Sequence, residues 1–332
     1  MPERVLRRLF VRLPNWLGDA LMARPLLAAL RRGLPQARIV ACGPGPLLEL
    51  LAGDGAWDAA LAWPAPGERL RAAAGGAFDA ALVLPPSFSS AWHAWRCGAR
   101  VRTGFAEDHR GLLLTHPVRR GARGDRHQGR EYLALGAAVG VDAGALDVTA
   151  LPLGEAQPPA AAGDALERAA VLAPGAAYGP AKRWPLDRFI ATGRALAGRG
   201  LRVLACGGAG EREACDALAA ACGGTSLAGR TSLREQAAIC SRAAVVVSND
   251  SGMAHLAGAV GARTVAIFGS TSSAWTAPLG PHVAVVQRAP VCSPCFRRTC
   301  AIGYACLEAV AVTDVLRAVD ALDAARPAGA CA

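Results

Sequence analysis

Short apolar segments alternate with helical segments along the chain, and this alternation constrains the fold more than any other feature. In the first half, buried strands are predicted at RRLFVRL, ARIVACG and FDAALVLPP, and a helix is predicted from about Ala20 to Arg32. In the second half, the pattern returns at RAAVLAPG, LRVLACGG, AVVVSND and RTVAIFG. Strands that alternate with helices predict parallel sheets with crossover helices.

A segment rich in Pro, Gly and Ala separates the two series around residues 152–165 and is typical of a linker. The sequence therefore predicts two doubly wound α/β domains, residues 1–155 and 156–312, followed by a helix and tail over residues 313–332. Hydrophobic residues make up 52% of the 332 positions, which is enough to build a core in each domain.

The chain shows no sign of export or membrane insertion. No uncharged apolar run approaches the ~18–20 residues that cross a bilayer, and the basic start is interrupted by proline and Asp19. Seven of the eleven cysteines are scattered and are most simply small core residues in a reducing compartment. We therefore expect a cytoplasmic protein without a signal peptide.

Positive charge is concentrated in one part of the chain. The net charge is +10, and residues 96–130 contain nine arginines against three acidic residues. Such a segment suits a phosphorylated substrate, an acidic lipid surface or nucleic acid, or is simply a solvated surface. We expect no nucleic-acid partner, because few aromatic residues for base stacking lie in or just before the segment (Trp92, Trp95, Phe105) and it has no recognisable binding motif.

The stretch NDSGMAHLAGAVGARTVAIFG, residues 249–269, predicts a strand end, a turn, a helix and another strand. The first amides of such a helix can bind a phosphate group. Asp250 or Ser251 could serve only as the N-cap. Capping, however, explains neither Gly252, which permits close approach to the turn, nor His255, one turn into the helix.

A second loop, PGAAYGPAKRWP at residues 174–185, also follows a predicted buried strand. A glycine-rich loop with Lys182 at this position suits a diphosphate. The GxxxxGK[ST] signature of nucleoside triphosphatases is absent, and neither half contains a clean GxGxxG, which weakens the alternative of a dinucleotide dehydrogenase.

In the first half, LPNWLGDAL places Asp19 at the first turn between strand and helix. Asp19 could be an ordinary helix cap. If two α/β domains face each other, it could also line their cleft and accept a proton from a substrate hydroxyl.

Five stretches occur in collinear order between residues 5 and 315: LPNWLGDALMARPLL, LPPSFSSAWHAWRCGARVRTGF, RGLLL, PGAAYGPAKRWP and SNDSGMAHLAGAVGARTVAIFGSTSSAWTAPLG. Together they resemble the bacterial ADP-heptose:lipopolysaccharide heptosyltransferases of glycosyltransferase family 9, and most of all the type II members. The resemblance implies the GT-B fold, in which two Rossmann-like domains of doubly wound parallel sheets face each other across a cleft.

The resemblance also implies an inverting transfer of L-glycero-D-manno-heptose from ADP-heptose to a Kdo2-lipid A inner-core acceptor, without a cofactor for the chemistry. It implies peripheral contact with the cytoplasmic face of the inner membrane. Asp19 matches the general base and Lys182 the lysine on the donor diphosphate. The donor-binding residues carried over by position are Gly175, Lys182, Glu211, Thr231, Asp250, Ser251, Gly252, Met253 and His255. The acceptor-binding residues expected in the first domain are Asn15, Arg102, Arg110, Arg119 and Arg120.

Four cysteines are clustered in CSPCFRRTCAIGYAC, where Cys292, Cys295, Cys300 and Cys306 follow the spacing C-x2-C-x4-C-x5-C. This spacing is compatible with a structural zinc site, and the alternatives are reduced structural cysteines or ligands of an iron–sulfur cluster. Nothing in the sequence ties this cluster to the donor motifs.

Two alternatives to a type II transferase stay open. One is a type I or type III heptosyltransferase, or a related transferase with another sugar or acceptor. The other is a nucleotide-binding or nucleic-acid-binding module without catalysis, for which Asp19 would not be needed and binding to nucleic acid would depend steeply on salt.

Overall fold

The computed structural model describes residues 6–142, 144–146 and 149–325. The chain divides into two compact units, Met1–Asp147 and Val148–Ala332. The division falls a few residues before the predicted boundary at 155/156. The segment just before the predicted linker belongs to the second unit because Leu151 is buried there and its backbone N–H donates to the carbonyl of Ala259 (2.7 Å).

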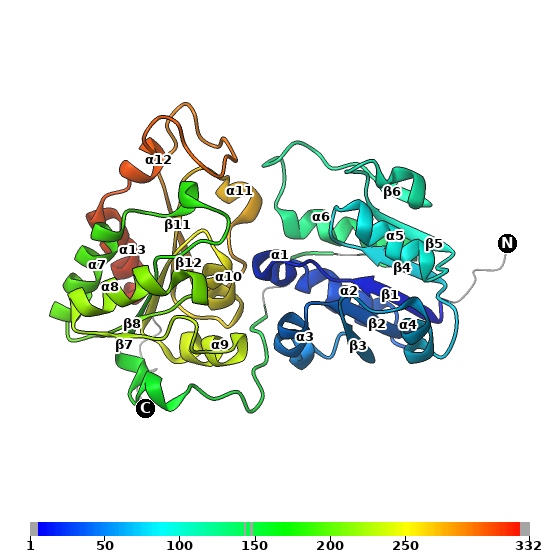
Figure 1. The fold of residues 1–332 in the computed structure, drawn as a ribbon, viewed down its shortest axis with the longest axis horizontal. Coiled ribbons are helices and arrows are strands. Elements are labelled where there is room, and N and C mark those ends of the chain that lie inside the picture. The colour runs from blue at the N-terminus through cyan, green and yellow to red at the C-terminus, as the bar shows by residue number, and fades with distance from the viewer. Residues whose placement is uncertain (1–5, 143, 147–148, 326–332) are drawn as a thin grey trace. The chain divides into compact units, whose positions relative to one another are not determined.

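The N-terminal unit is built on a six-stranded sheet in the order β3-β2-β1-β4-β5-β6, in which all neighbours are parallel (Figure 1). The strands are β1 (Arg8–Arg12), β2 (Arg38–Gly43), β3 (Ala59–Ala62), β4 (Ala80–Val83), β5 (Val101–Phe105) and β6 (His116–Val118). The helices are α1 (Leu17–Met22), α2 (Arg24–Gly33), α3 (Gly45–Leu51), α4 (Gly67–Ala74), α5 (Phe88–Arg96) and α6 (Gln128–Ala134), with short 3-10 turns such as η2 (Arg110–Leu113).

The C-terminal unit has a six-stranded parallel sheet in the order β12-β11-β10-β7-β8-β9. The strands are β7 (Ala169–Ala173), β8 (Arg202–Ala205), β9 (Thr225–Ser226), β10 (Val245–Asn249), β11 (Thr264–Phe268) and β12 (Val283–Gln287). The helices are α7 (Leu186–Gly198), α8 (Arg212–Cys222), α9 (Leu233–Arg242), α10 (Gly252–Ala259), α11 (Ser273–Thr276), α12 (Ala305–Glu308) and α13 (Val312–Ala324). Two 3-10 turns, η6 (Pro180–Lys182) and η7 (Ala209–Glu211), precede α7 and α8.

The two units share one topology. In each, the first strand lies beside the fourth, and the order of the strands reverses between them, at β1/β4 and at β7/β10. This is the Rossmann-type order 3-2-1-4-5-6, and the prediction of two doubly wound α/β domains is confirmed. In such sheets ligands bind beyond the carboxyl ends of the strands, at the point of reversal.

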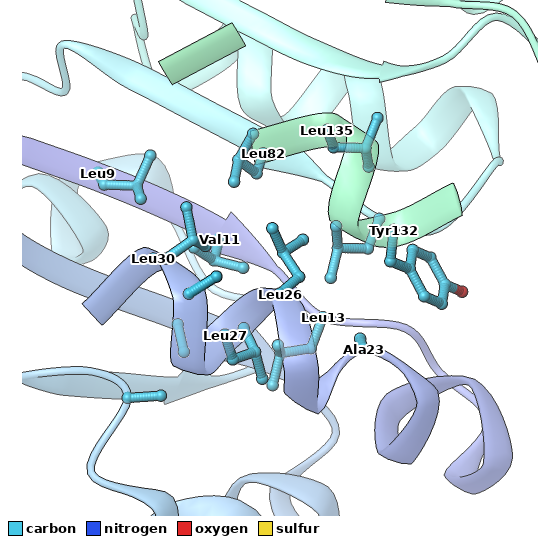
Figure 2. Close-up of a cluster of buried hydrophobic side chains, with 14 of the residues drawn as sticks. Leu9, Val11, Leu13, Ala23, Leu26, Leu27, Leu30, Leu82, Tyr132 and Leu135 are labelled. Atoms are coloured by element: carbon cyan, nitrogen blue, oxygen red, sulfur yellow. The ribbon is translucent and has the colours of Figure 1, made fainter. Parts of the chain in front are cut away.

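The central strands are buried on both faces, as expected of a parallel sheet covered by helices. Figure 2 shows one of the buried clusters of the N-terminal unit, in which Leu9 and Val11 of β1 lie close to Leu26 and Leu30 of α2. Tyr132 of α6 completes the same cluster. These contacts fix the carboxyl end of β1, from which the chain turns into α1.

The predicted helix from Ala20 to Arg32 is in fact two helices, α1 and α2. Pro25 lies in the first turn of α2 and has no N–H to continue the hydrogen-bond ladder of α1. The break leaves Asp19 in the first turn of the short helix α1. Among the residues that the structure describes, no helix is both long and apolar enough to cross a membrane.

Candidate functional site

In the C-terminal unit, one buried side chain joins two loops at the point where the strand order reverses. Asn249 ends β10, and its Nδ2 donates to the carbonyls of Pro174 (2.7 Å) and Gly175 (3.3 Å) after β7. Its Oδ1 accepts a hydrogen bond from the backbone N–H of Trp184 (3.0 Å). Asn249 thereby holds both ends of the loop 174–184 against the turn that begins α10.

Lys182 and Asp250, predicted from separate motifs, form an ion pair at this turn. The Nζ of Lys182 lies 2.6 Å from the Oδ2 of Asp250, whose side chain is 2% exposed. Thr271 Oγ1 donates a hydrogen bond to the same oxygen, and the Lys182 ammonium lies 5.0 Å from the centre of the Tyr178 ring. An ammonium group has three N–H donors, so Lys182 can hold Asp250 and an anionic ligand together.

The start of α10 is available to an anion. Ser251 occupies the N-cap position, but its side chain does not cap the helix, and its hydroxyl lies 3.1 Å from that of Ser248. The alternative that Ser251 is only a cap is therefore not supported. Met253 and His255 are buried within α10, where they support the helix from inside the unit.

Glu211 is brought against the loop after β7. Its Oε2 accepts a hydrogen bond from the backbone N–H of Gly208 (2.8 Å), and a Cβ atom built on Gly175 would lie 2.0 Å from its carboxyl carbon. Gly175 therefore lacks a side chain because the Glu211 carboxylate passes over it. Thr231 lies on the next loop, which the backbone hydrogen bond from Gly229 to Gly207 (3.0 Å) ties to the Glu211 loop.

A pocket of about 310 Å³ is lined in part by the loop 174–184, and neither Lys182 nor Asp250 lines it. Its walls are mostly apolar and include Pro174, Trp184, Tyr304 and Leu307. Such a lining suits a flat apolar group better than a diphosphate. The diphosphate is predicted instead at the turn that carries Asp250.

The loop that carries the clustered cysteines packs directly on the loop 174–184, which the sequence did not indicate. Tyr178 Oη donates to the carbonyl of Phe296 (2.5 Å), and the N–H of Ala181 donates to the carbonyl of Arg298 (3.0 Å). Gly179 adopts φ +147°, and a Cβ atom there would lie 2.7 Å from the Arg298 carbonyl oxygen. The cysteine loop therefore helps to position the segment that ends at Lys182.

The thiols themselves are not arranged as a ligand set. Within the described ranges, no group of three or more His, Cys, Asp or Glu side chains could hold a metal ion. Cys292 and Cys295 are exposed, whereas Cys306 is buried. The backbone N–H groups of Ile302 and Tyr304 donate to Cys300 Sγ (3.4 Å each) and lower the pKa of that thiol. The expectation of a zinc site thus receives no support from the geometry.

In the N-terminal unit, Asp19 belongs to a chain of polar side chains at the carboxyl end of β1. Gln128 Nε2 donates to Asp19 Oδ1 (3.2 Å) and to the Tyr132 hydroxyl oxygen (2.9 Å). Burial, and then the negative charge of Asp19, raise the pKa of Tyr132 well above its usual value. The tyrosine therefore stays neutral, and Gln128 orients the half-buried carboxylate of Asp19.

Arg12, which sequence reasoning missed, holds the loop that leads to Asp19. Its guanidinium is buried, donates to the carbonyl of Leu13 and to Asn15 Oδ1 (2.6 Å), and lies 4.0 Å from the centre of the Trp63 ring. Burial lowers the pKa of Arg12 to about 10, so it remains charged at neutral pH. The available signal was a single arginine inside the apolar strand RLFVRL.

Arg110 is fully buried, so its side chain is not accessible to a substrate. It donates to the carbonyls of Phe105 (2.7 Å), Val83 (3.3 Å) and Pro85, and to Ser90 Oγ (3.1 Å). Burial lowers its pKa to about 10. Arg110 ties together the ends of β4 and β5 and the start of α5, so we leave it out of the acceptor-binding residues proposed below.

The other three predicted arginines differ in exposure. Arg102 donates to the carbonyls of Ala99 (2.6 Å) and Leu113 (2.7 Å). Arg120 pairs with Glu131 (3.0 Å) and Glu107 (3.4 Å). Arg119 is exposed, as is Asn15. Arg119 and Asn15 are therefore the more accessible of the predicted acceptor contacts.

Comparison with known proteins identifies relatives along most of the chain. The model of glycosyltransferase family 9 (heptosyltransferase) matches residues 67–305. Lipopolysaccharide heptosyltransferase 2 of Salmonella typhimurium is 29% identical over 299 residues, covering 82% of this chain and 86% of that protein. Lipooligosaccharide heptosyltransferase 2 of Haemophilus influenzae is 28% identical over 307 residues, with the same coverage of each chain. The solved structure of E. coli ADP-heptose lps heptosyltransferase II superposes with a TM-score of 0.79 at 26% identity, covering 95% of this chain and 98% of that one.

The buried network of Arg110 generates a stability prediction. Arg110→Met should lower the free energy of unfolding by at least about 2 kcal/mol, because several buried carbonyls lose their donor. Arg119→Met, which removes the same charge from an exposed position, should change it by less than about 0.5 kcal/mol. Urea unfolding followed by circular dichroism measures both. Equal effects of the two substitutions would contradict the structural role of Arg110.

Proposed function

The chain belongs to glycosyltransferase family 9, and from this premise we propose that it transfers L-glycero-D-manno-heptose from ADP-heptose to the heptose of a lipopolysaccharide inner core, as a heptosyltransferase II. It is a glycosyltransferase. The observation that carries the proposal is the Lys182–Asp250 pair at the start of α10, in a chain whose relatives over four-fifths of its length are named heptosyltransferase 2.

The donor diphosphate is proposed to bind at the turn between β10 and α10. There the free N–H groups of the helix start and the ammonium of Lys182 offer positive charge, and Gly252 lets a ligand come close. Glu211 is proposed to bind a ribose hydroxyl, and Thr231 to lie near the adenine. The backbone hydrogen bond that ties the Thr231 loop to the Glu211 loop supports this arrangement.

We propose the following chemistry for these residues. Asp19 removes the proton of the acceptor hydroxyl as its oxygen attacks the anomeric carbon from the side opposite the departing ADP. One displacement breaks the bond to ADP and inverts the configuration without a covalent intermediate. Negative charge that grows on the diphosphate is stabilised by Lys182 and by the helix-start amides, so the reaction requires no cofactor. Gln128 keeps the Asp19 carboxylate oriented.

The acceptor is proposed to be Kdo2-lipid A that already bears one heptose. Its phosphate and carboxylate groups are anionic, and Asn15 and Arg119 are exposed to receive them, whereas Arg102 and Arg120 are half-buried. Because the acceptor is a lipid, we propose peripheral contact with the cytoplasmic face of the inner membrane.

Asp19→Asn should lower the rate of acceptor-dependent ADP release at least about 100-fold, because the amide cannot accept the proton. The affinity for ADP should stay within about twofold of the original protein, because the proposed donor contacts lie in the other unit. The measurement is ADP release from ADP-heptose with a mono-heptosylated acceptor. Asp142→Asn, at an exposed position of the same unit, is the control.

Substantial residual turnover of Asp19→Asn would remove Asp19 from the role of base. Turnover only with an acceptor that carries no heptose would assign the protein to type I instead. Release with neither acceptor would point to another sugar donor.

Lys182→Met should weaken ADP binding about 10- to 100-fold, because a charge-assisted hydrogen bond to the diphosphate is lost. Isothermal titration calorimetry measures the affinity. Arg194→Met removes a cation from the exposed face of α7 and should leave ADP affinity unchanged. Unaltered affinity in Lys182→Met would contradict the proposed diphosphate contact.

The zinc site stays a prediction. If Cys292, Cys295, Cys300 and Cys306 bind one structural zinc ion, protein purified without chelator should contain about one equivalent of zinc. Cys300→Ser, which removes the thiol with the lowered pKa, should reduce that content. Less than about 0.2 equivalents in the original protein would exclude the site.

A further inference from the structure

Helix α5 presents aromatic side chains to solvent. Phe88, Trp92 and Trp95 are 45%, 44% and 47% exposed, and their spacing places them on one side of the helix. The Trp92 and Trp95 rings are stacked with their centres 4.8 Å apart, and those of Phe88 and Trp92 are 6.5 Å apart. The side of α5 that faces the unit contains Ser90, Ala91 and Ala94, which are buried.

The neighbouring turn η2 packs on α5 and carries a further exposed apolar side chain. Arg110, the first residue of η2, donates to Ser90 Oγ of α5 (3.1 Å), so the two elements lie together. Leu112 of η2 is 97% exposed. We call Phe88, Trp92, Trp95 and Leu112 the aromatic face. Figure 1 shows α5 beside β4 and β5 of the N-terminal unit.

The aromatic face is bordered by positive charge at one end. Arg96 ends α5 and Arg100 follows it, and both are exposed. Arg71 of α4 reaches this end of α5, where its Nη1 lies 3.4 Å from the carbonyl of Arg96. At the opposite end, Asp108 accepts a hydrogen bond from the N–H of Phe88 (2.6 Å). Arg71 and Arg96 are therefore both located at the end of α5 that follows Trp95, and Arg100 comes four residues later in the chain.

This arrangement does not contribute to the fold. A helix on the surface of a soluble domain normally turns its large apolar residues inward, whereas α5 buries only small residues and exposes its aromatic ones. Half of the large hydrophobic residues found exposed in the described structure belong to the aromatic face. A gathered apolar surface with a cationic border is typical of a docking site.

We propose that the aromatic face docks on a bilayer that contains anionic lipids. Trp and Phe side chains favour the interface between headgroups and acyl chains, and arginines near it attract anionic headgroups. The net charge of +10 favours the same partner. The choice of a lipid partner rests on the proposed function, because a lipid acceptor lies in such a bilayer. The docking surface itself rests on the exposed side chains of α5 and η2.

The first test is co-sedimentation with vesicles of phosphatidylethanolamine and phosphatidylglycerol. The double variant Trp92→Ser, Trp95→Ser should bind at least about tenfold more weakly than the original protein, because two interfacial side chains are lost. Val291→Ser with Ile302→Ser removes exposed apolar residues from the other unit and is the matched control. Equal binding of the double variant and the original protein would overturn the proposal.

The second test concerns charge. Arg96→Gln with Arg100→Gln should weaken binding to the same vesicles by about fivefold per arginine, and vesicles of phosphatidylcholine alone should bind the original protein poorly. Arg242→Gln with Arg317→Gln makes the same change of charge on the C-terminal unit and should have a much smaller effect. Equal binding to both vesicle types would overturn the assignment to anionic lipid.

A third measurement separates docking from catalysis. With a water-soluble acceptor that lacks acyl chains, the Trp92→Ser, Trp95→Ser variant should release ADP at a rate within about twofold of the original protein. With an acceptor embedded in vesicles, its rate of ADP release should fall in proportion to its weaker vesicle binding. A loss of rate with the soluble acceptor would show that the aromatic face serves catalysis, and would overturn the proposal. Concentration-dependent dimerisation of the original protein that the variant abolishes would also overturn the proposal, because a second copy of the chain would then cover the aromatic face.

If the original protein binds vesicles but releases no ADP with any acceptor, the proposed function fails while the docking surface stands. If it releases ADP but does not bind vesicles, the docking proposal fails while the proposed function stands.

Discussion

The candidate donor site depends on the buried amide of Asn249. Its three hydrogen bonds hold the Pro174–Gly175 end and the Trp184 end of one loop against the turn after β10. That loop carries Lys182, and the turn carries Asp250, so the ion pair forms only where these backbones are fixed together. A buried amide can satisfy a donor and two acceptors at once without a net charge, which an aspartate at the same position could not do.

In the N-terminal unit, buried charged side chains hold the corresponding loops in place. Its sheet has the same strand order, but the loops at the carboxyl ends of β1, β4 and β5 are held by the buried guanidiniums of Arg12 and Arg110. Burial lowers both pKa values to about 10, which leaves both groups charged at neutral pH and bound to carbonyl oxygens. The arginine-rich segment thus divides into residues that stabilise the unit and exposed residues, among them Arg96, Arg100 and Arg119, that are available to anionic partners.

Much of the site could be predicted because each of its residues follows a buried strand. The apolar runs fixed where strands end, and residues at the ends of parallel strands meet at one edge of the sheet. This reasoning singled out Asp19, Lys182 and Asp250 as candidates, whereas Glu211 was predicted only from the resemblance to glycosyltransferase family 9. The strand pattern did not indicate Gln128, which contacts Asp19 across 109 residues of sequence, or Thr271, which contacts Asp250 across 21. Arg110 was predicted to bind the acceptor, but the fold buries it.

The pattern of apolar runs and turns in the sequence was enough to establish two doubly wound α/β domains and to single out the segments proposed to contact a donor, because hydrophobic periodicity and turn residues act locally. Three features required the folded chain: the joining of loops by Asn249, the packing of the cysteine loop on Tyr178 and Ala181, and the outward aromatic face of α5. Each depends on which side chains meet across the sheet or remain uncovered, and long-range packing decides this rather than local preference.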